Sequence, residues 1–243
     1  MGEALLTLEA VSKSYWRGPH ELRVLSELSL ELEEGEFTVV WGKRGAGKTS
    51  LLKIAAGLES CDRGSVCFQG VDLACMSERE HAQLMRERIA WVRRGGPRSD
   101  LRMHDYVALP LLPVWGHRGA YAQAREALAR VGIGECARRY WRSLSDEERA
   151  LVGIARGIAR RPSLLLLDDP TANLGVRERE QLVALLRELA EGGVGVLMTV
   201  PDMNEMMGAH QIAALSGGRL IAPPQLPPRP ANVIDFPGTE RLV

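Results

Sequence analysis

The sequence has no excess of charge of either sign, and no apolar run of the roughly 18 to 20 residues that would span a bilayer. Its 243 residues include 31 basic and 31 acidic side chains, so we expect no nucleic-acid partner. The opening residues, MGEALLTLEA, lack the basic and apolar segments of a secretory signal. We therefore expect a cytoplasmic chain that reaches a membrane only through a partner.

Cysteine is also scarce. The four residues have no metal-ligand spacing and are expected to be reduced thiols: Cys61, Cys67, Cys75 and Cys136. The rest of the composition is ordinary for a globular protein, with 45% apolar and 26% charged residues. The length is enough to bury a substantial core in one large or two small folding units.

Strand-like and helix-like segments alternate, which predicts a parallel sheet with helices on its faces. Strand patterns occupy residues 5–15, 22–42, 64–70, 163–169 and 194–200, and helical patterns occupy 47–59, 145–161 and 176–191. Residues 77–145 are expected to be mainly helical, with glycine- and proline-rich loops around a short helix at 93–119. The domain is expected to span residues 1–222, followed by a proline-rich, extended tail at 223–243.

The stretch TVVWGKRGAGKTSLL contains the pattern G-x-x-x-x-G-K-T between a strand-like run and a helix. Its candidate phosphate-binding residues are Gly42, Lys43, Arg44, Gly45, Ala46, Gly47, Lys48, Thr49 and Ser50. Glycines allow the backbone to wrap a phosphate with its N–H groups facing the anion. Lys48 is expected to reach the β- and γ-phosphates and Thr49 to bind Mg²⁺. A glycine-rich turn without a ligand is the alternative, which both flanks disfavour.

The stretch SLLLLDD supplies a second half of this site. It places Asp168 at the end of a buried apolar run, where a carboxylate beside a phosphate loop is expected to bind Mg²⁺. The alternative is an aspartate that caps the next turn.

Beyond these motifs, the sequence resembles the nucleotide-binding domains of ATP-binding cassette (ABC) transporters over nearly all of residues 5–222. The matching segments are VSKSY, GKRGAGKTSLL, VALPLL, LS…VGIARGIARRPSLLLLDDPTANL and GGRLI. VALPLL and PTANL are most similar to the branch that serves lipoprotein release, macrolide efflux and cell division. The resemblance implies an α/β fold: a P-loop NTPase (RecA-like) core with an antiparallel β subdomain and an inserted helical subdomain at about 77–145.

Such domains work as head-to-tail pairs, so the resemblance implies ATP and Mg²⁺ held between the phosphate loop of one subunit and the signature segment of another. It further implies a second ABC subunit, identical or different, and an integral-membrane permease that docks between residues 94 and 119 at the cytoplasmic face. Tyr15 matches the family's adenine-stacking aromatic, with a half-buried strand-end tyrosine as the alternative. Ser145 would contact the nucleotide of the partner subunit.

The signature segment departs from the family pattern. LSGG at 215–218 lies after the last catalytic strand, where we expect a turn. At the signature position, Asp146 and Glu147 replace the family's two glycines, while Ser145 and Glu148 form a capping-box pattern. A carboxylate ~5 Å from the γ-phosphate would oppose dimer closure by roughly 3 kcal/mol at an effective dielectric of ~20. It would do so unless it points away or meets a cation.

Two further departures concern hydrolysis. Asp169 replaces the glutamate that polarises the attacking water in the family, and a misplacement of about 1 Å can lower a rate ~100-fold. The alternative is that a shifted backbone restores its role as a general base. Pro201 replaces a histidine that touches the γ-phosphate and offers no donor. His210 is expected on a helix as a surface or half-buried residue, and not as a substitute.

The last departures affect a glutamine and an aspartate of the family. Arg94 is the nearest match to the position of the family's glutamine. It would bind the γ-phosphate or neutralise Asp146. The alternative is that Arg93 and Arg94 are only a solvated pair. Gly175 replaces the aspartate that links the two composite sites. Together these features imply an ATP-binding subunit with slow or absent hydrolysis as a homodimer. The alternative is a non-hydrolytic scaffold or ATP-dependent regulator of a membrane complex.

Overall fold

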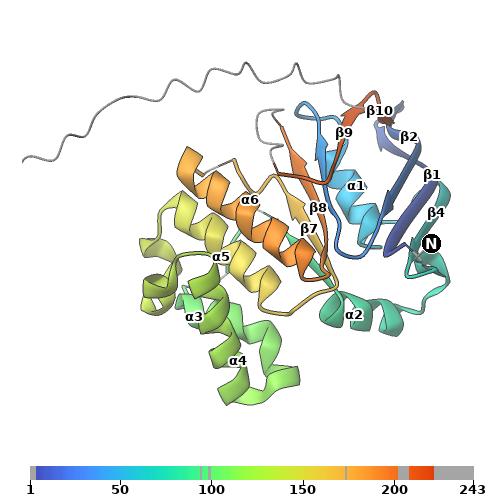
Figure 1. The fold of residues 1–243 in the computed structure, drawn as a ribbon. Coiled ribbons are helices and arrows are strands. Elements are labelled where there is room, and N and C mark those ends of the chain that lie inside the picture. The colour runs from blue at the N-terminus through green and yellow to red at the C-terminus, as the bar shows by residue number, and fades with distance from the viewer. Residues whose placement is uncertain (1–3, 94, 98–99, 173, 202–207, 222–243) are drawn as a thin grey trace, which may run out of the picture.

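The computed structural model describes residues 4–93, 95–97, 100–172, 174–201 and 208–221 (Figure 1). The strands are β1 (Leu6–Arg17), β2 (His20–Leu32), β3 (Phe37–Trp41), β4 (Arg63–Phe68), β5 (Val71–Asp72), β6 (Ile89–Val92), β7 (Leu164–Asp168), β8 (Gly195–Val200), β9 (Gln211–Ser216) and β10 (Arg219–Ile221). The α-helices are α1 (Lys48–Ala55), α2 (Glu78–Glu87), α3 (Met103–Ala108), α4 (Leu112–Arg130), α5 (Asp146–Ile158) and α6 (Val176–Glu191). Short 3₁₀ helices are η1 (Leu73–Cys75), η2 (Leu109–Leu111), η3 (Gly134–Arg138) and η4 (Trp141–Ser143).

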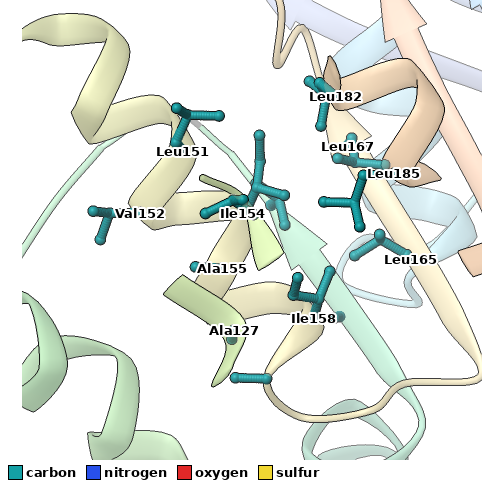
Figure 2. Close-up of a cluster of buried hydrophobic side chains, with 14 of the residues drawn as sticks. Ala127, Leu151, Val152, Ile154, Ala155, Ile158, Leu165, Leu167, Leu182 and Leu185 are labelled. Atoms are coloured by element: carbon teal, nitrogen blue, oxygen red, sulfur yellow. The ribbon is translucent and has the colours of Figure 1, made fainter. Parts of the chain in front are cut away.

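The central sheet has six strands in the order β10-β9-β3-β8-β7-β6, and all neighbours pair in parallel except β10 with β9. Four consecutive leucines, 164–167, form most of β7 and are fully buried. Such a run suits a strand covered on both faces, because successive side chains point to opposite sides. Leu165 and Leu167 face the helical side, where they pack against side chains of α5 and α6 (Figure 2).

The other face of the central sheet packs on α1, which lies between this sheet and a second one (Figure 1). The second sheet is antiparallel, with the order β2-β1-β4-β5. This arrangement confirms the expected α/β class with an antiparallel β subdomain. It also brings the β1–β2 hairpin beside the start of α1, where the phosphate loop ends.

The helical expectation for residues 77–145 is wrong at one place. Residues 89–92, inside that range, form strand β6 and pair in parallel with β7. Three of the four side chains are buried, so pairing with the leucine strand outweighs the helical pattern of the preceding residues. The segment 93–119 also holds more helix than the single short one expected, namely α3, η2 and the first turns of α4. Gly116, with φ 62° and ψ 177°, interrupts α4.

The LSGG sequence at 215–218 forms the turn of the β9–β10 hairpin. Ser216 pairs with Arg219, and both intervening residues have positive φ, 56° at Gly217 and 77° at Gly218. This two-residue turn suits glycine and confirms the turn expected at these residues. Among the described helices, none combines the length and apolar character that a membrane span needs. The expected tail, residues 223–243, lies outside the described residues.

Candidate functional site

The phosphate loop connects β3 to α1 at the carboxyl edge of the central sheet. Gly45 and Gly47 have φ values of 85° and 101°, which side chains rarely adopt. A Cβ atom on Gly47 would lie 2.8 Å from Cγ1 of Val24, and one on Gly42 would lie 2.8 Å from the carbonyl oxygen of Leu215. The loop therefore depends on glycine both for its backbone conformation and for close packing.

Lys48 begins α1 and turns back over the loop. Its ammonium group donates to the carbonyl oxygen of Gly42 and, at 3.2 Å, to that of Lys43. Burial lowers the pKa of Lys48, and the nearby carboxylates of Asp169 and Asp168 partly oppose that shift. The lysine thus lies between the loop backbone and two carboxylates, the position expected of a phosphate-binding cation.

Thr49 and Asp168 are 119 positions apart in the chain, yet their side chains meet. The Thr49 hydroxyl donates to Oδ2 of Asp168 at 2.8 Å, and the buried Thr199 hydroxyl donates to Oδ1 at 3.1 Å. Among the described residues, no three His, Cys, Asp or Glu side chains cluster as a metal site. A hydroxyl beside one carboxylate still fits Mg²⁺, which takes few protein ligands and completes its shell with water and phosphate oxygens.

A cavity of about 560 Å³ opens beside this pair and the loop. Four cationic side chains and two carboxylates line it: Arg44, Lys48, Lys53, Arg93, Asp168 and Asp169. The excess of two positive charges favours an anionic ligand. Sequence reasoning did not assign Arg93, Trp91 or Val24 to this cavity, because their places depend on strand register and packing.

Tyr15 lies in strand β1, on the side of the β1–β2 hairpin that faces the helix after the phosphate loop. Its hydroxyl group is 3.0 Å from the hydroxyl of Ser50, in the first turn of α1. The Lys13 ammonium lies 5.7 Å from the ring centroid. Burial raises the pKa of Tyr15, so the phenol stays neutral. The structure therefore brings Tyr15 to the phosphate-loop helix, while its role towards a base stays a prediction.

Asp169 directly follows β7 and has a left-handed backbone, with φ 51°. Its N–H donates to the carbonyl oxygen of Thr199 at 3.0 Å. Aspartate tolerates this conformation better than most residues. The turn places Asp169 in the wall of the 560 Å³ cavity and of a second one of about 300 Å³.

The signature segment starts α5 and satisfies its own helix end. The backbone N–H of Glu148 donates to Oγ of Ser145 at 3.1 Å, and the N–H of Ser145 donates to Oε2 of Glu148 at 2.8 Å. This pair confirms the capping box. Glu148 also forms an ion pair with Arg139. The cap holds the signature serine at the exposed beginning of the helix.

The two acidic residues of this segment both find partners within the chain. Oδ1 of Asp146 lies 2.9 Å from Nη1 of Arg149. Oε1 of Glu147 accepts from the backbone N–H of Gly175 at 3.3 Å. The sequence allows for a cation that pairs with Asp146, and the structure has one, Arg149. Arg94, the candidate considered from the sequence, lies outside the described residues.

The 300 Å³ cavity lies between α5 and the loop after β6. Arg93, Asp168 and Asp169 line both cavities, whereas Asp146 and Arg149 line only this one. The Trp141 indole packs on the backbone of Gly96 and meets the Tyr106 ring edge-on, with centroids 5.7 Å apart. The wall shared by the cavities thus lies between the phosphate loop and the signature helix.

Pro201 and His210 lie at opposite ends of the sheet. Pro201 is exposed and follows β8 at the edge near the phosphate loop, where the N–H of Gly42 donates to the Val200 carbonyl at 3.1 Å. Nδ1 of His210 accepts from the N–H of Phe37 at 3.0 Å, at the amino end of β3. The expectation of a helix at His210 is wrong, since it precedes β9 directly and this backbone pairing excludes a helix.

Comparison with known proteins gives one consistent result. The ABC transporter family matches residues 25–172. The chain is 33% identical to the lipoprotein-releasing system ATP-binding protein LolD of Pseudomonas syringae pv. tomato, over 90% of this chain and 98% of that protein. It is 32% identical to the cell division ATP-binding protein FtsE of Escherichia coli K12, over 89% and 97%. It is 28% identical to the macrolide export ATP-binding/permease protein MacB of a Shewanella species, over 96% of this chain and 36% of that protein.

A solved structure extends the similarity to the fold. A dimeric ATP-binding cassette in a post-hydrolysis state, bound to ADP and Pi, superposes with a TM-score of 0.81 at 27% identity. The alignment covers 88% of this chain and 96% of that one. These matches confirm the P-loop NTPase fold and the resemblance drawn from the motifs.

Proposed function

Because the chain belongs to the ABC transporter family, we propose that it is an ATP-binding subunit of a membrane complex that binds Mg-ATP and hydrolyses it slowly or not at all as a homodimer. The observation that carries this proposal is the contrast between two parts of the site. The Thr49–Asp168 pair fits a metal-bound triphosphate, whereas the signature helix carries Asp146 and Glu147 at its exposed start.

The binding half follows from the loop and its charges. Lys48 would contact the β- and γ-phosphates, and the loop N–H groups would face the phosphate oxygens. Thr49 and Asp168 would hold Mg²⁺, which neutralises phosphate charge when bound. Tyr15 would support the adenine ring with its face. The 560 Å³ cavity and its excess of positive charge support an anionic nucleotide as the ligand.

The weak chemistry follows from the residues around the terminal phosphate. Asp169 is one methylene shorter than glutamate, so its carboxylate would reach less far towards the attacking water. Pro201 offers no donor. Ser145 would face the partner's nucleotide, but the helix dipole beside it is already compensated by the chain's own carboxylates. Each subunit contributes to both composite sites, so an intact partner would still leave each site altered.

The partners are proposed from the relatives and from the surface. Two relatives are named as ATP-binding proteins, one of a lipoprotein-releasing system, and MacB joins an ATP-binding part to a permease. We infer a second ABC subunit, as in the dimeric solved cassette, and an integral-membrane permease. Exposed Leu109, Val114 and Trp115 support docking through residues 94–119. The chain would then lie at the cytoplasmic face of the membrane.

The test compares equilibrium ATP binding and phosphate release for the purified chain, alone and with its permease. Lys48→Ala should abolish binding, whereas Arg187→Ala, on the far part of α6, should not change it. We expect stoichiometric binding with little phosphate release. Failure of the unmodified chain to bind ATP would refute the proposed function. Bound ATP that the permease complex leaves intact would favour the scaffold or regulator over a transport motor.

A further inference from the structure

Arg93 directly follows β6, and the register of the sheet brings it beside the metal site. Val92 pairs with Leu167 in the parallel β6–β7 ladder, so the next residues, Arg93 and Asp168, lie at the same level. Neighbouring strands are about 4.8 Å apart. The phosphate loop follows β3, which lies on the opposite side of β7 from β6. Arg93 therefore lies beyond Asp168 as seen from the loop.

The alternation of side chains directs Arg93 to the same face as Asp168. Ile89 and Trp91 pack in the core on the α1 side, whereas Ala90 and Val92 pack in the opposite core. The same alternation in β7 puts Leu164 and Leu166 on the α1 side, and Asp168 follows them by two residues. The lining of the 560 Å³ cavity agrees, since Arg93 shares it with Lys48 and Thr49.

Arg93 is not held in an ion pair within the described part of the chain. Its side chain forms none of the ion pairs found among the described residues; its one aromatic contact there places the guanidinium carbon 5.8 Å from the Trp91 ring centroid. By contrast, Arg149 in the neighbouring cavity is paired with Asp146. Stacking on an indole restrains a guanidinium while its N–H groups remain available for an anion. The geometry is that of a cation ready for an anionic ligand.

We propose that Arg93 binds the terminal phosphate of the nucleotide and positions it. The inference rests on the proposed function, because it concerns the same site. Lys48 approaches the phosphates from the loop, whereas Arg93 approaches from the far side of Asp168, where the end of a triphosphate would lie. A guanidinium can donate two parallel hydrogen bonds to phosphate oxygens. Arg93 therefore distinguishes a triphosphate from a diphosphate. The contacts of the phosphate loop alone discriminate less well between the two nucleotides.

The test measures equilibrium binding of Mg-ATP and Mg-ADP to the full chain carrying Arg93→Gln, Arg93→Lys or the control Arg187→Gln, with thermal unfolding to check the fold. Arg93→Gln should weaken ATP binding by on the order of 10- to 100-fold, the effect of losing a charge-assisted contact, and change ADP binding by less than about threefold. Arg93→Lys should recover part of the ATP affinity. The control should match the unmodified chain for both nucleotides.

The outcomes separate this inference from the proposed function. Equal losses for ATP and ADP, or no loss for ATP, in a chain whose binding still depends on Lys48 would overturn the role of Arg93 alone. An unmodified chain that binds neither nucleotide would overturn both.

Discussion

Removing the two carboxylates at the start of α5 should strengthen ATP-driven dimerisation. The change is Asp146→Ala with Glu147→Ala, which keeps the capping box of Ser145 and Glu148. Alanine is chosen because it favours a helix, so the effect of charge is not mixed with the flexibility of glycine. Asp146→Ala also releases Arg149 from its ion pair, which in the proposed dimer would leave a cation near the partner's nucleotide.

The magnitude follows from the exposure of these groups. The Asp146 side chain is 74% exposed and that of Arg149 is 33% exposed, so solvent screens the charges. A unit charge ~5 Å from a phosphate then contributes about 1 kcal/mol at a dielectric near 80. Counting Asp146 alone, because Glu147 is held by the backbone N–H of Gly175, two composite sites in a dimer give about 2 kcal/mol, or roughly a 30-fold lower dimer dissociation constant. Loss of the helix-dipole and ion-pair terms should lower monomer stability by about 1 to 2 kcal/mol.

Light scattering with saturating Mg-ATP, at low and high salt, measures the dimer dissociation constant. The matched control is Glu188→Ala with Glu191→Ala, which removes the same charge from the far end of α6 and breaks comparable ion pairs. An unchanged dissociation constant in the α5 variant would refute the electrostatic argument. An equal change in the control would refute it too, because net charge would then explain the result. The gain should shrink at high salt.

Two other substitutions test single contacts of the site. Gly175 is the N-cap of α6, where aspartate is favoured, but the Cβ of Gly175→Asp would lie 2.6 Å from the movable Oε2 of Glu178 and 3.7 Å from Oε1 of Glu147. The two effects should offset each other to within about 1 kcal/mol in urea, and Glu178→Gln should stabilise the Gly175→Asp chain because it removes a like charge. An unchanged stability after Glu178→Gln would count against the charge argument. Asp169→Asn removes an attraction that raises the pKa of Lys48, so that pKa falls further. Since binding requires charged Lys48, ATP affinity should then be lost at a lower pH, and an unchanged alkaline limb in a pH titration would contradict this.

The parts of the site that could be predicted from the sequence are those whose chemistry is local. The phosphate loop was recognisable because G-x-x-x-x-G-K-T lies between a strand and a helix, and its glycines have the expected conformations at Gly45 and Gly47. Asp168 followed from its place at the end of a buried strand. The capping box at Ser145 depends on a spacing of three residues, and the structure has it.

The parts that could not be predicted depend on contacts between distant segments. Residues 89–92 follow a helical pattern, but pairing with β7 makes them a strand, and only that register brings Arg93 level with Asp168. The contact between Glu147 and Gly175 joins two positions that lie 28 residues apart in the sequence. His210 is held by the backbone of Phe37, 173 positions away, which no local pattern reveals.

The most direct test of the central claim is the fate of ATP bound to the purified chain. The chain is loaded with Mg-ATP and freed of excess nucleotide, and the bound nucleotide is then analysed over hours while released phosphate is followed. We expect a full complement of nucleotide recovered as ATP, with none retained by Lys48→Ala. Sustained phosphate release that Lys48→Ala abolishes would contradict it, because the residues around the terminal phosphate would then be competent for hydrolysis.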